Sequence, residues 1–305
     1  YKQSGGHAQV TIRRNFLAEA SPLWVEWFFW TRPVISDFGN QLKLFKQDVK
    51  PEGSIKMKKT NLVLCPGLLC DARMWKPQME ALSDVAHCWV PIMTEHDTLA
   101  SLAEAVLRAA PEGNVSVAGL SMGGFLALEM ARQAPERIER LALINSRASP
   151  ETDMEMKRRY NLINLARKER KFSPATLPIE RLILHPSKWE DASIIGLLRE
   201  MAVSSGIEAY IRQQQAVLSR ADFRPGLMGI RMPTLVVCGR DDQLTPVEDS
   251  EEIAAAIQGA RLTILEECGH MSTLEKPAEV TAELRRWLAC GLDASEILVN
   301  RHHSC

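Results

Sequence analysis

Short runs of apolar residues alternate with helical patterns along most of the chain after residue 56. The apolar runs predict strands at 62–65, 86–92, 114–119, 140–145, 234–239 and 261–266. Between them, apolar positions recur with the spacing of one helix face and predict helices at 74–82, 99–109, 122–133, 247–257 and 277–289. Such alternation is typical of a parallel sheet covered by helices. We therefore predict an α/β fold with a mostly parallel sheet flanked by helices.

The alternation of strands and helices stops between residues 147 and 231. This stretch contains helical patterns at 151–170, 177–184, 191–203 and 206–219, and no convincing strand pattern. In open α/β proteins, ligands bind at the carboxyl ends of the strands. We therefore expect 147–231 to form an all-helical cap over those ends, inserted into a core made of 57–146 and 232–290.

The two ends of the chain do not share the strand–helix pattern. Residues 1–56 contain one aromatic cluster, LWVEWFFW at 23–30, which is too short to span a bilayer. From Met57 the sequence MKKTNLVLC is followed by Pro66-Gly67, as expected for a buried strand that leads into a turn. We interpret 1–56 either as an N-terminal appendage or as an upstream region that does not belong to the functional protein, and 291–305 as a tail.

Composition and charge narrow the classes of function. Of the 305 residues, 46% are hydrophobic and 25% charged, which excludes a disordered or low-complexity chain. The net charge of −1 gives no general case for a nucleic-acid or membrane partner. Seven cysteines without CxxC spacing argue against a disulfide framework or a structural zinc site. We expect reduced thiols, a cytoplasmic protein and no bound metal.

Ser121 is the candidate nucleophile. It is the central residue of GLSMGG at 119–124, which matches the pattern G-x-S-x-G. A predicted strand precedes this motif and a predicted helix follows it, as the motif requires. The sharp turn exposes the serine, and the N-terminus of the helix offers free N–H groups for a developing oxyanion.

A serine hydroxyl needs a base, and His270 is the candidate. It follows a predicted strand in the sequence EECGHMSTLEKP, next to Gly269. The residue that orients its imidazole is expected in GRDDQLTP at 239–246, after another strand. We choose Asp242, with Asp241 as a residue that caps or solvates the turn. The order Ser121, Asp242, His270 differs from that of the two major serine-protease folds.

An oxyanion hole needs two donors. The N–H of Met122, directly after the nucleophile, is one candidate, and the N–H of Leu68, in the loop after the first strand, is the other. Cys65 and Cys70 flank that loop, but a cysteine nucleophile needs a nearby base and a lowered pKa. We interpret these two thiols as packing residues.

The segments CPGLLCDARMW, GLSMGG, GRDDQLTP and CGHMSTLEKP together resemble the α/β-hydrolase superfamily, over roughly residues 61–288. Within it, the chain is similar to small serine carboxylesterases with a helical cap. The resemblance implies the α/β-hydrolase fold and the same triad and oxyanion donors. Two features depart from the pattern. Pro66-Gly67 replaces the usual His-Gly, and residues 1–56 show no hairpin for the two usual antiparallel first strands, so we expect a sheet that begins near residue 61.

The identity of residue 121 also distinguishes between the reactions that members of this superfamily catalyse. Haloalkane dehalogenases and epoxide hydrolases use an aspartate nucleophile and are disfavoured by Ser121. Carboxylesterase, thioesterase, carbon–carbon bond hydrolase, acyltransferase and cofactor-free perhydrolase activities stay open, because one scaffold hosts them all. A ligand-sensing protein with slow turnover is the alternative of a different class. We predict a serine hydrolase of a small-molecule ester or thioester that needs no cofactor.

The predicted cap is more basic than the rest of the domain. Residues 147–231 hold 15 Lys and Arg against 10 Asp and Glu, whereas 57–146 and 232–305 together hold 14 against 23. A solvated helix face explains such an excess, but so does an anionic substrate or an acidic carrier protein. Arg147 follows a predicted strand at the catalytic edge, and we name it as a candidate for binding a substrate carboxylate.

Overall fold

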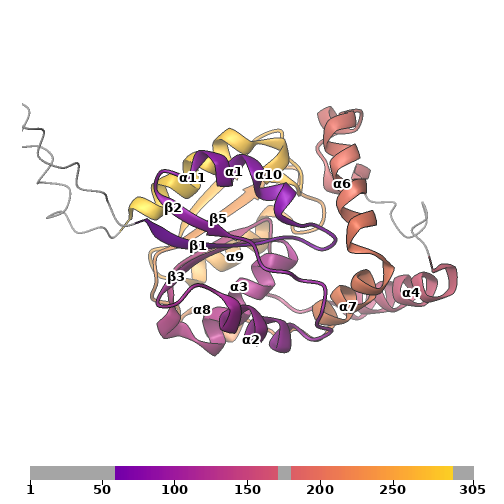
Figure 1. Cartoon of the computed structure of the whole chain (residues 1–305), viewed down its shortest axis with the longest axis horizontal. Coiled ribbons are helices and arrows are strands. Elements are labelled where there is room, and N and C mark those ends of the chain that lie inside the picture. Colours follow the sequence, from indigo (N-terminus) through magenta and orange to yellow (C-terminus); the bar gives the residue numbers. More distant parts are fainter. Residues whose placement is uncertain (1–58, 171–179, 291–305) are drawn as a thin grey trace, which may run out of the picture. The chain divides into compact units, whose positions relative to one another are not determined.

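Six strands form one sheet in the computed structural model, which describes residues 59–170 and 180–290 (Figure 1). The strands are β1 (Thr60–Cys65), β2 (Ala86–Trp89), β3 (Val115–Leu120), β4 (Ile138–Ile144), β5 (Thr234–Gly239) and β6 (Arg261–Leu265). Their order is β2-β1-β3-β4-β5-β6, and every neighbouring pair is parallel. The predicted α/β fold with a parallel sheet is therefore confirmed.

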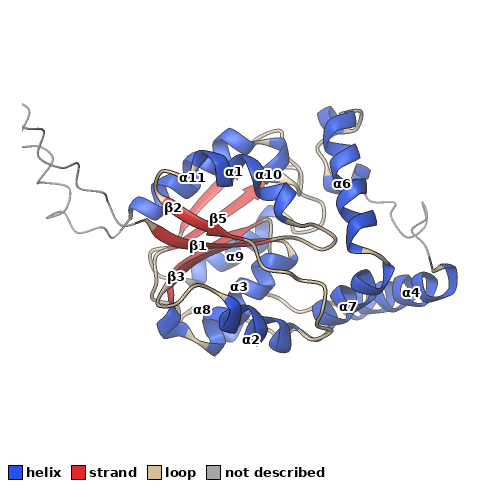
Figure 2. Ribbon diagram, in the orientation of Figure 1, coloured by secondary structure: helices blue, strands red, loops and turns tan. Residues whose placement is uncertain are grey.

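Helices cover both faces of this sheet (Figures 1 and 2). The helices of one face are α2 (Leu99–Ala109), α3 (Met122–Gln133) and α9 (Val247–Ala256), and those of the other are α1 (Lys76–Ala81) and α11 (Pro277–Ala289). Within β1, Val63 packs in the first core layer, whereas Leu62 and Leu64 pack in the second. Because both faces are buried, the strands have the continuous apolar sequences seen in this chain.

The described residues between β4 and β5 form helices without a strand. These helices are α4 (Asp153–Glu169), α5 (Glu180–Ile183), α6 (Ala192–Ser205), α7 (Ile207–Leu218) and α8 (Arg224–Leu227). We call residues 147–231 the helical insertion. Helix α4 begins with a capping box between Thr152 and Glu155. Ile163 of α4 packs with Tyr210 of α7 and with Leu69 of the core, so the insertion joins the loop after β1.

Short elements account for most differences between the predicted and observed structure. The single-turn elements that we did not predict are η1 (Ala72–Trp75), η2 (Pro135–Arg137), η3 (Pro186–Lys188), α8 and α10 (Ser272–Glu275). One turn is too short to show a helical period in the sequence. The strand predicted at 86–92 ends at Trp89, ahead of Pro91, which lacks an N–H for the ladder.

Several predictions fall on parts of the chain that the structure does not describe. The appendage at 1–56 and the tail at 291–305 lie outside the described residues, as do residues 177–179 of the helix predicted at 177–184. Within the described ranges, no helix combines the length and the apolar character that a membrane crossing needs.

The strand order determines where a binding crevice forms. Strand β1 lies between β2 and β3, so the connections from β1 and β3 leave in opposite directions across the sheet. In open parallel sheets, such a switch point opens a crevice at the carboxyl ends of the strands. The loop that begins after Cys65 and the turn at Ser121 both start at this point.

Candidate functional site

Ser121 occupies a strained turn between β3 and α3. Its backbone has φ 56° and ψ −117°, a conformation that residues with a Cβ rarely adopt. The Ser121 N–H donates to the carbonyl of Ile144, 3.0 Å away, and the Ser146 hydroxyl donates to the Ser121 carbonyl over 3.0 Å. Such strain persists where the surrounding structure fixes it, and it is concentrated at functional sites.

Two glycines allow this turn to form. A Cβ on Gly119 would overlap the carbonyl of Gly123, and a Cβ on Gly123 would overlap the carbonyl of Cys65. The first turn of α3 therefore packs directly on the backbone of β1 and β3. The G-x-S-x-G pattern follows from these contacts, because no larger residue fits at either glycine.

His270 and Asp242 form a buried pair. The His270 Nδ1 atom lies 2.8 Å from Oδ2 and 3.0 Å from Oδ1 of Asp242, and both side chains are almost inaccessible to solvent. Burial alone raises the pKa of Asp242. The charge and hydrogen bond of His270, with further hydrogen bonds from Asn145 and the Thr245 backbone, outweigh it and lower this pKa to about 2. The carboxylate therefore stays ionised beside the imidazole.

Asn145 and Thr245, which the sequence analysis did not identify, complete the surroundings of Asp242. The Asn145 Nδ2 donates to Asp242 Oδ2 over 2.8 Å, and the Thr245 hydroxyl donates to the same oxygen over 2.7 Å. The N–H groups of Leu244 and Thr245 donate to Oδ1 over 2.9 and 3.0 Å. Asn145 has φ 45° and directly follows the buried strand β4, and this place in the chain was the available signal.

Asp241 has different surroundings from Asp242. Its side chain is 42% exposed, and one carboxylate oxygen lies 3.7 Å from Nε2 of His185 in the helical insertion. The structure brings Asp242 to His270 and leaves Asp241 at the surface of the turn.

The loop after β1 is held in a defined conformation next to Ser121. Leu69 has φ 60°, and its N–H donates to Oε1 of Gln213 over 2.9 Å. Gln213 belongs to α7 and is fully buried, and its Nε2 donates to the carbonyl of Met93 over 3.1 Å. Met122 is the first residue of α3, so no carbonyl of the helix can accept from its N–H. Gln213 is a further residue that the sequence did not reveal, because its partners lie far away in the chain.

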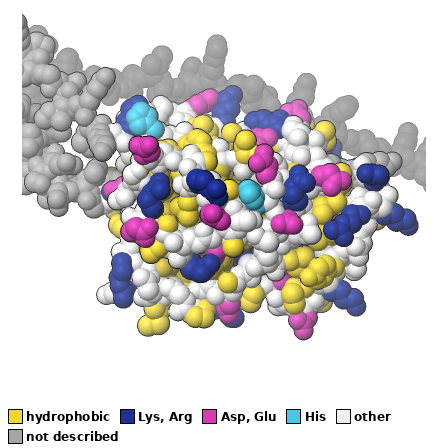
Figure 3. All heavy atoms as spheres, turned by 60° about the horizontal axis from the view of Figure 1, so that its bottom comes forward, with side chains coloured by type: hydrophobic (Ala, Val, Ile, Leu, Met, Phe, Trp, Pro, Cys, Tyr) yellow, Lys and Arg dark blue, Asp and Glu magenta, His cyan; other side chains and the backbone are white. Residues whose placement is uncertain are grey.

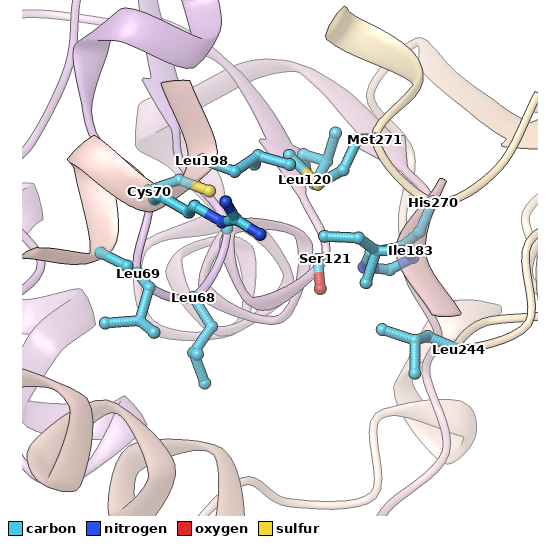
Figure 4. A pocket seen from close by; sticks show the side chains of 13 residues that line it. Leu68, Leu69, Cys70, Leu120, Ser121, Ile183, Leu198, Leu244, His270 and Met271 are labelled. Carbon is cyan, nitrogen blue, oxygen red and sulfur yellow. The ribbon is translucent and has the colours of Figure 1, made fainter. Parts of the chain in front are cut away.

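A cavity of about 130 Å³ opens on Ser121 and His270 (Figure 4). Figure 4 shows the Ser121 hydroxyl pointing into the space between Leu68 and Leu244. The other lining residues are mostly apolar, and they are Gly67, Leu69, Cys70, Leu120, Ile183, Leu198, Arg199, Ala202 and Met271. Four of them, from Ile183 to Ala202, come from the helical insertion. The cavity is smaller than the roughly 300–1,000 Å³ of sites for drug-sized ligands.

Arg147 does not line this cavity. Its side chain is 11% exposed, and its guanidinium pairs with Glu151 over 3.0 Å and with Glu155 over 2.9 Å. Burial lowers the pKa of Arg147, but the two carboxylates outweigh this effect and raise it. The structure thus places Arg147 in an internal ion-pair network, and its pairing with a substrate stays a prediction.

Cys70 is the one cysteine among the described residues that lines the cavity. Burial, followed by the nearby charge of Asp71, raises the pKa of its thiol to about 12, and burial also raises that of Cys65. A thiol of this kind is not ionised at neutral pH and is a weak nucleophile. Among the described residues, no cluster of three His, Cys, Asp or Glu side chains could hold a metal ion.

The fold and the site together define a doubly wound α/β protein with a pocket at the carboxyl ends of its strands. The model of the family described as "Alpha/beta hydrolase family" matches residues 62–284, which is well over half of the chain. The chain therefore belongs to the alpha/beta hydrolase family.

Curated relatives and solved structures agree with this assignment. The chain is 27% identical over 250 residues to "Putative carbamate hydrolase RutD" of Serratia proteamaculans, covering 74% of this chain and 90% of that protein. It is 28% identical over 238 residues to a pimeloyl-[acyl-carrier protein] methyl ester esterase of Nitrosomonas europaea, covering 72% and 92%. The structure of a thermophilic esterase from Thermogutta terrifontis superposes with a TM-score of 0.68 at 25% identity, covering 76% and 90%. These relatives support a hydrolase.

Proposed function

We propose that the protein is a serine hydrolase that cleaves a small carboxylic ester or thioester through an acyl-enzyme. Ser121 is the nucleophile, His270 the general base and acid, and Asp242 the carboxylate that orients the imidazole. The observation that carries this proposal is the joint placement of Ser121 and His270 on one cavity, with His270 Nδ1 bound to Asp242. This contact leaves Nε2 as the ring nitrogen available to Ser121.

In the first step, His270 takes the Ser121 proton while the Ser121 oxygen attacks the carbonyl carbon. The carbonyl electrons move to the oxygen, and the N–H groups of Leu68 and Met122 stabilise the resulting oxyanion. When the tetrahedral species collapses, the bond to the leaving oxygen or sulfur breaks. The imidazolium gives its proton to that atom, and the acyl group stays on Ser121.

In the second step, water replaces the leaving group. His270 takes a proton from the water as its oxygen attacks the acyl carbon, and a second oxyanion forms at the same donors. Its collapse breaks the bond to Ser121, which recovers its proton from the imidazolium, and releases the carboxylic acid. Asp242 stays ionised throughout, which its lowered pKa favours.

The cavity supports a substrate with a short apolar group next to the scissile carbonyl, because apolar side chains make up most of its lining. An acidic carrier protein that presents such a group is a further candidate, since the helical insertion carries the basic excess. One relative is named a putative carbamate hydrolase, so carbamates are a further class of substrate to test. Carbon–carbon bond hydrolysis, acyl transfer and slow-turnover ligand sensing use the same residues and stay as alternatives.

The test is hydrolysis of p-nitrophenyl esters, acyl thioesters and carbamates of graded chain length. Ser121→Ala should lower kcat/KM for the best substrate roughly 10⁴-fold or more, because the nucleophile is lost while the fold is kept. Ser116→Ala removes a buried serine from β3, the strand that precedes Ser121, and should leave turnover unchanged. Equal activity of wild type and Ser121→Ala would exclude the proposed mechanism, and binding without turnover would favour a sensor.

A further inference from the structure

Glu275 is a buried carboxylate that the proposed mechanism does not use. It ends the short helix α10, five residues after His270, and is 5% exposed. Its Oε2 accepts from the N–H of His185 over 2.8 Å and from that of Gly269 over 3.2 Å, and its Oε1 accepts from the N–H of Met271 over 3.0 Å. One side chain thus binds the residues on either side of His270.

The helical insertion also binds the loop that carries His270, through backbone hydrogen bonds. The N–H of His270 donates to the carbonyl of Ile183 over 2.8 Å, and the N–H of Met271 donates to that carbonyl over 3.2 Å. A Cβ on Gly269 would come within 2.7 Å of the His185 nitrogen, so the two segments are in backbone contact. The N–H groups of residues 269, 270 and 271 are therefore all bound by Glu275 or Ile183.

We propose that Glu275 is a positioning residue, whose carboxylate fixes the His270 loop and residues 183–185 of the helical insertion in one arrangement. The proposal rests on the proposed function, because it assigns the effect of that arrangement to the placement of His270 between Ser121 and Asp242. A displacement of about 1 Å at a reacting group is enough to cost up to 10²-fold in rate.

The carboxylate form is what the three donors need. Both oxygens of Glu275 accept hydrogen bonds, whereas the amide of a glutamine accepts with one oxygen and turns an NH₂ toward an N–H. Burial raises the pKa of Glu275, although the three N–H groups and His185 lower it in part. The three N–H groups thus find acceptors on both oxygens of Glu275, which an amide of the same size provides on one side only.

The experiment compares wild type with Glu275→Gln. We expect kcat to fall about 10- to 100-fold with KM within twofold of wild type, because the cavity lining is unchanged and His270 is displaced. The melting temperature should change little, since a buried charge is removed along with a hydrogen bond. Glu275→Asp keeps the charge one methylene further away and should recover part of kcat.

Glu283→Gln is the matched control, because Glu283 is also buried but lies on α11 and pairs with Arg261 and Arg286. It should leave kcat unchanged. Amide hydrogen exchange over 183–185 and 268–272 provides a readout that needs no turnover, and Glu275→Gln should speed exchange in both segments.

These readouts separate the two proposals. If wild type lacks both hydrolysis and fluorophosphonate labelling of Ser121, the proposed function fails, and hydrogen exchange alone decides whether Glu275 holds the loop. If wild type is active and Glu275→Gln matches it in kcat and exchange, the role of Glu275 is wrong and the proposed function stands. Should Glu275→Gln not fold, the same comparisons with Glu275→Asp decide.

Discussion

Asp241 and Asp242 are adjacent in the sequence, and their different surroundings give the two carboxylates different roles. Asp242 accepts hydrogen bonds from Asn145, Thr245 and Leu244 in addition to its contact with His270. Asp241 is 42% exposed. Because each oxygen of Asp242 has fixed donors, its carboxylate cannot rotate freely and holds His270 in one orientation.

Exchange of each aspartate for asparagine tests this difference. Asp242→Asn places an amide beside His270 Nδ1 and favours the wrong tautomer, so kcat/KM for the best ester should fall about 10³- to 10⁴-fold. Asp241→Asn should stay within about threefold of wild type, because its contact with His185 spans 3.7 Å. Steady-state kinetics of the two variants decides the matter. A larger loss in Asp241→Asn would exchange the two roles.

The sequence could predict residues that carry chemistry within a local motif, but not those that act from a distance. Ser121 was predictable because its turn requires Gly119 and Gly123 nearby. Gln213 was not, because it meets Leu69 across 144 positions of the chain and lies in an otherwise ordinary helix. A single sequence contains no signal for such a pairing.

At the scale of elements, the ion pairs of the helical insertion explain part of its basic composition. The side chain of Glu151 is 4% exposed and pairs with Arg220 over 2.6 Å and with Arg147 and Arg159 over 3.0 Å each. Arg220 also lies over the ring of Phe125, 4.2 Å from its centre, which ties the insertion to α3. Figure 3 shows charged side chains of both signs interspersed over the side that carries α2 and α8 in Figure 1. Arg147, Arg159 and Arg220 thus account for part of the basic excess, because they form ion pairs within the insertion.

Replacement of Glu151 tests how much this network stabilises the fold. Burial alone raises the pKa of Glu151, but Arg159 and Arg220 lower it from 4.5 to about 2. That shift corresponds to roughly 3 to 4 kcal/mol, at about 1.4 kcal/mol per unit. Glu151→Gln should lower the free energy of unfolding by about this amount at pH 7, measured by urea denaturation. Glu104→Gln breaks an exposed pair with Arg108 and should cost less than about 0.5 kcal/mol. Equal losses would show that the network adds nothing.

The long elements were predictable because each spans several periods of its pattern. Helices α2, α3 and α11 have the predicted bounds, and β5 matches its prediction at both ends. The single turn α10 carries Glu275 and was missed, although it lies in the predicted site segment. Elements of one turn are formed by contacts such as those with His185, which periodicity does not contain.

At the scale of the whole molecule, the site is assembled by the sheet. Ser121 follows β3, Asn145 follows β4, Asp242 follows β5 and His270 follows β6. Since neighbouring parallel strands end at one edge, residues that are far apart in sequence meet there. The sequence predicted the strands and this edge, whereas the order of the strands came from the structure.

The pH dependence of unfolding follows from the carboxylates of this assembly. The pKa values of Asp242 and Glu151 are lowered to about 2, from ordinary values of 3.8 and 4.5. Between these limits the unfolded chain binds more protons than the folded one, so the free energy of unfolding should fall as the pH drops from about 4.5 to 2. Above this range the contribution of both groups is complete. Glu275 acts in the opposite sense, because burial raises its pKa and protonation favours the fold. Urea denaturation between pH 2.5 and 7 should therefore show an acid limb that is less steep in Glu151→Gln. An acid limb as steep as that of wild type would contradict the assignment of this titration to Glu151.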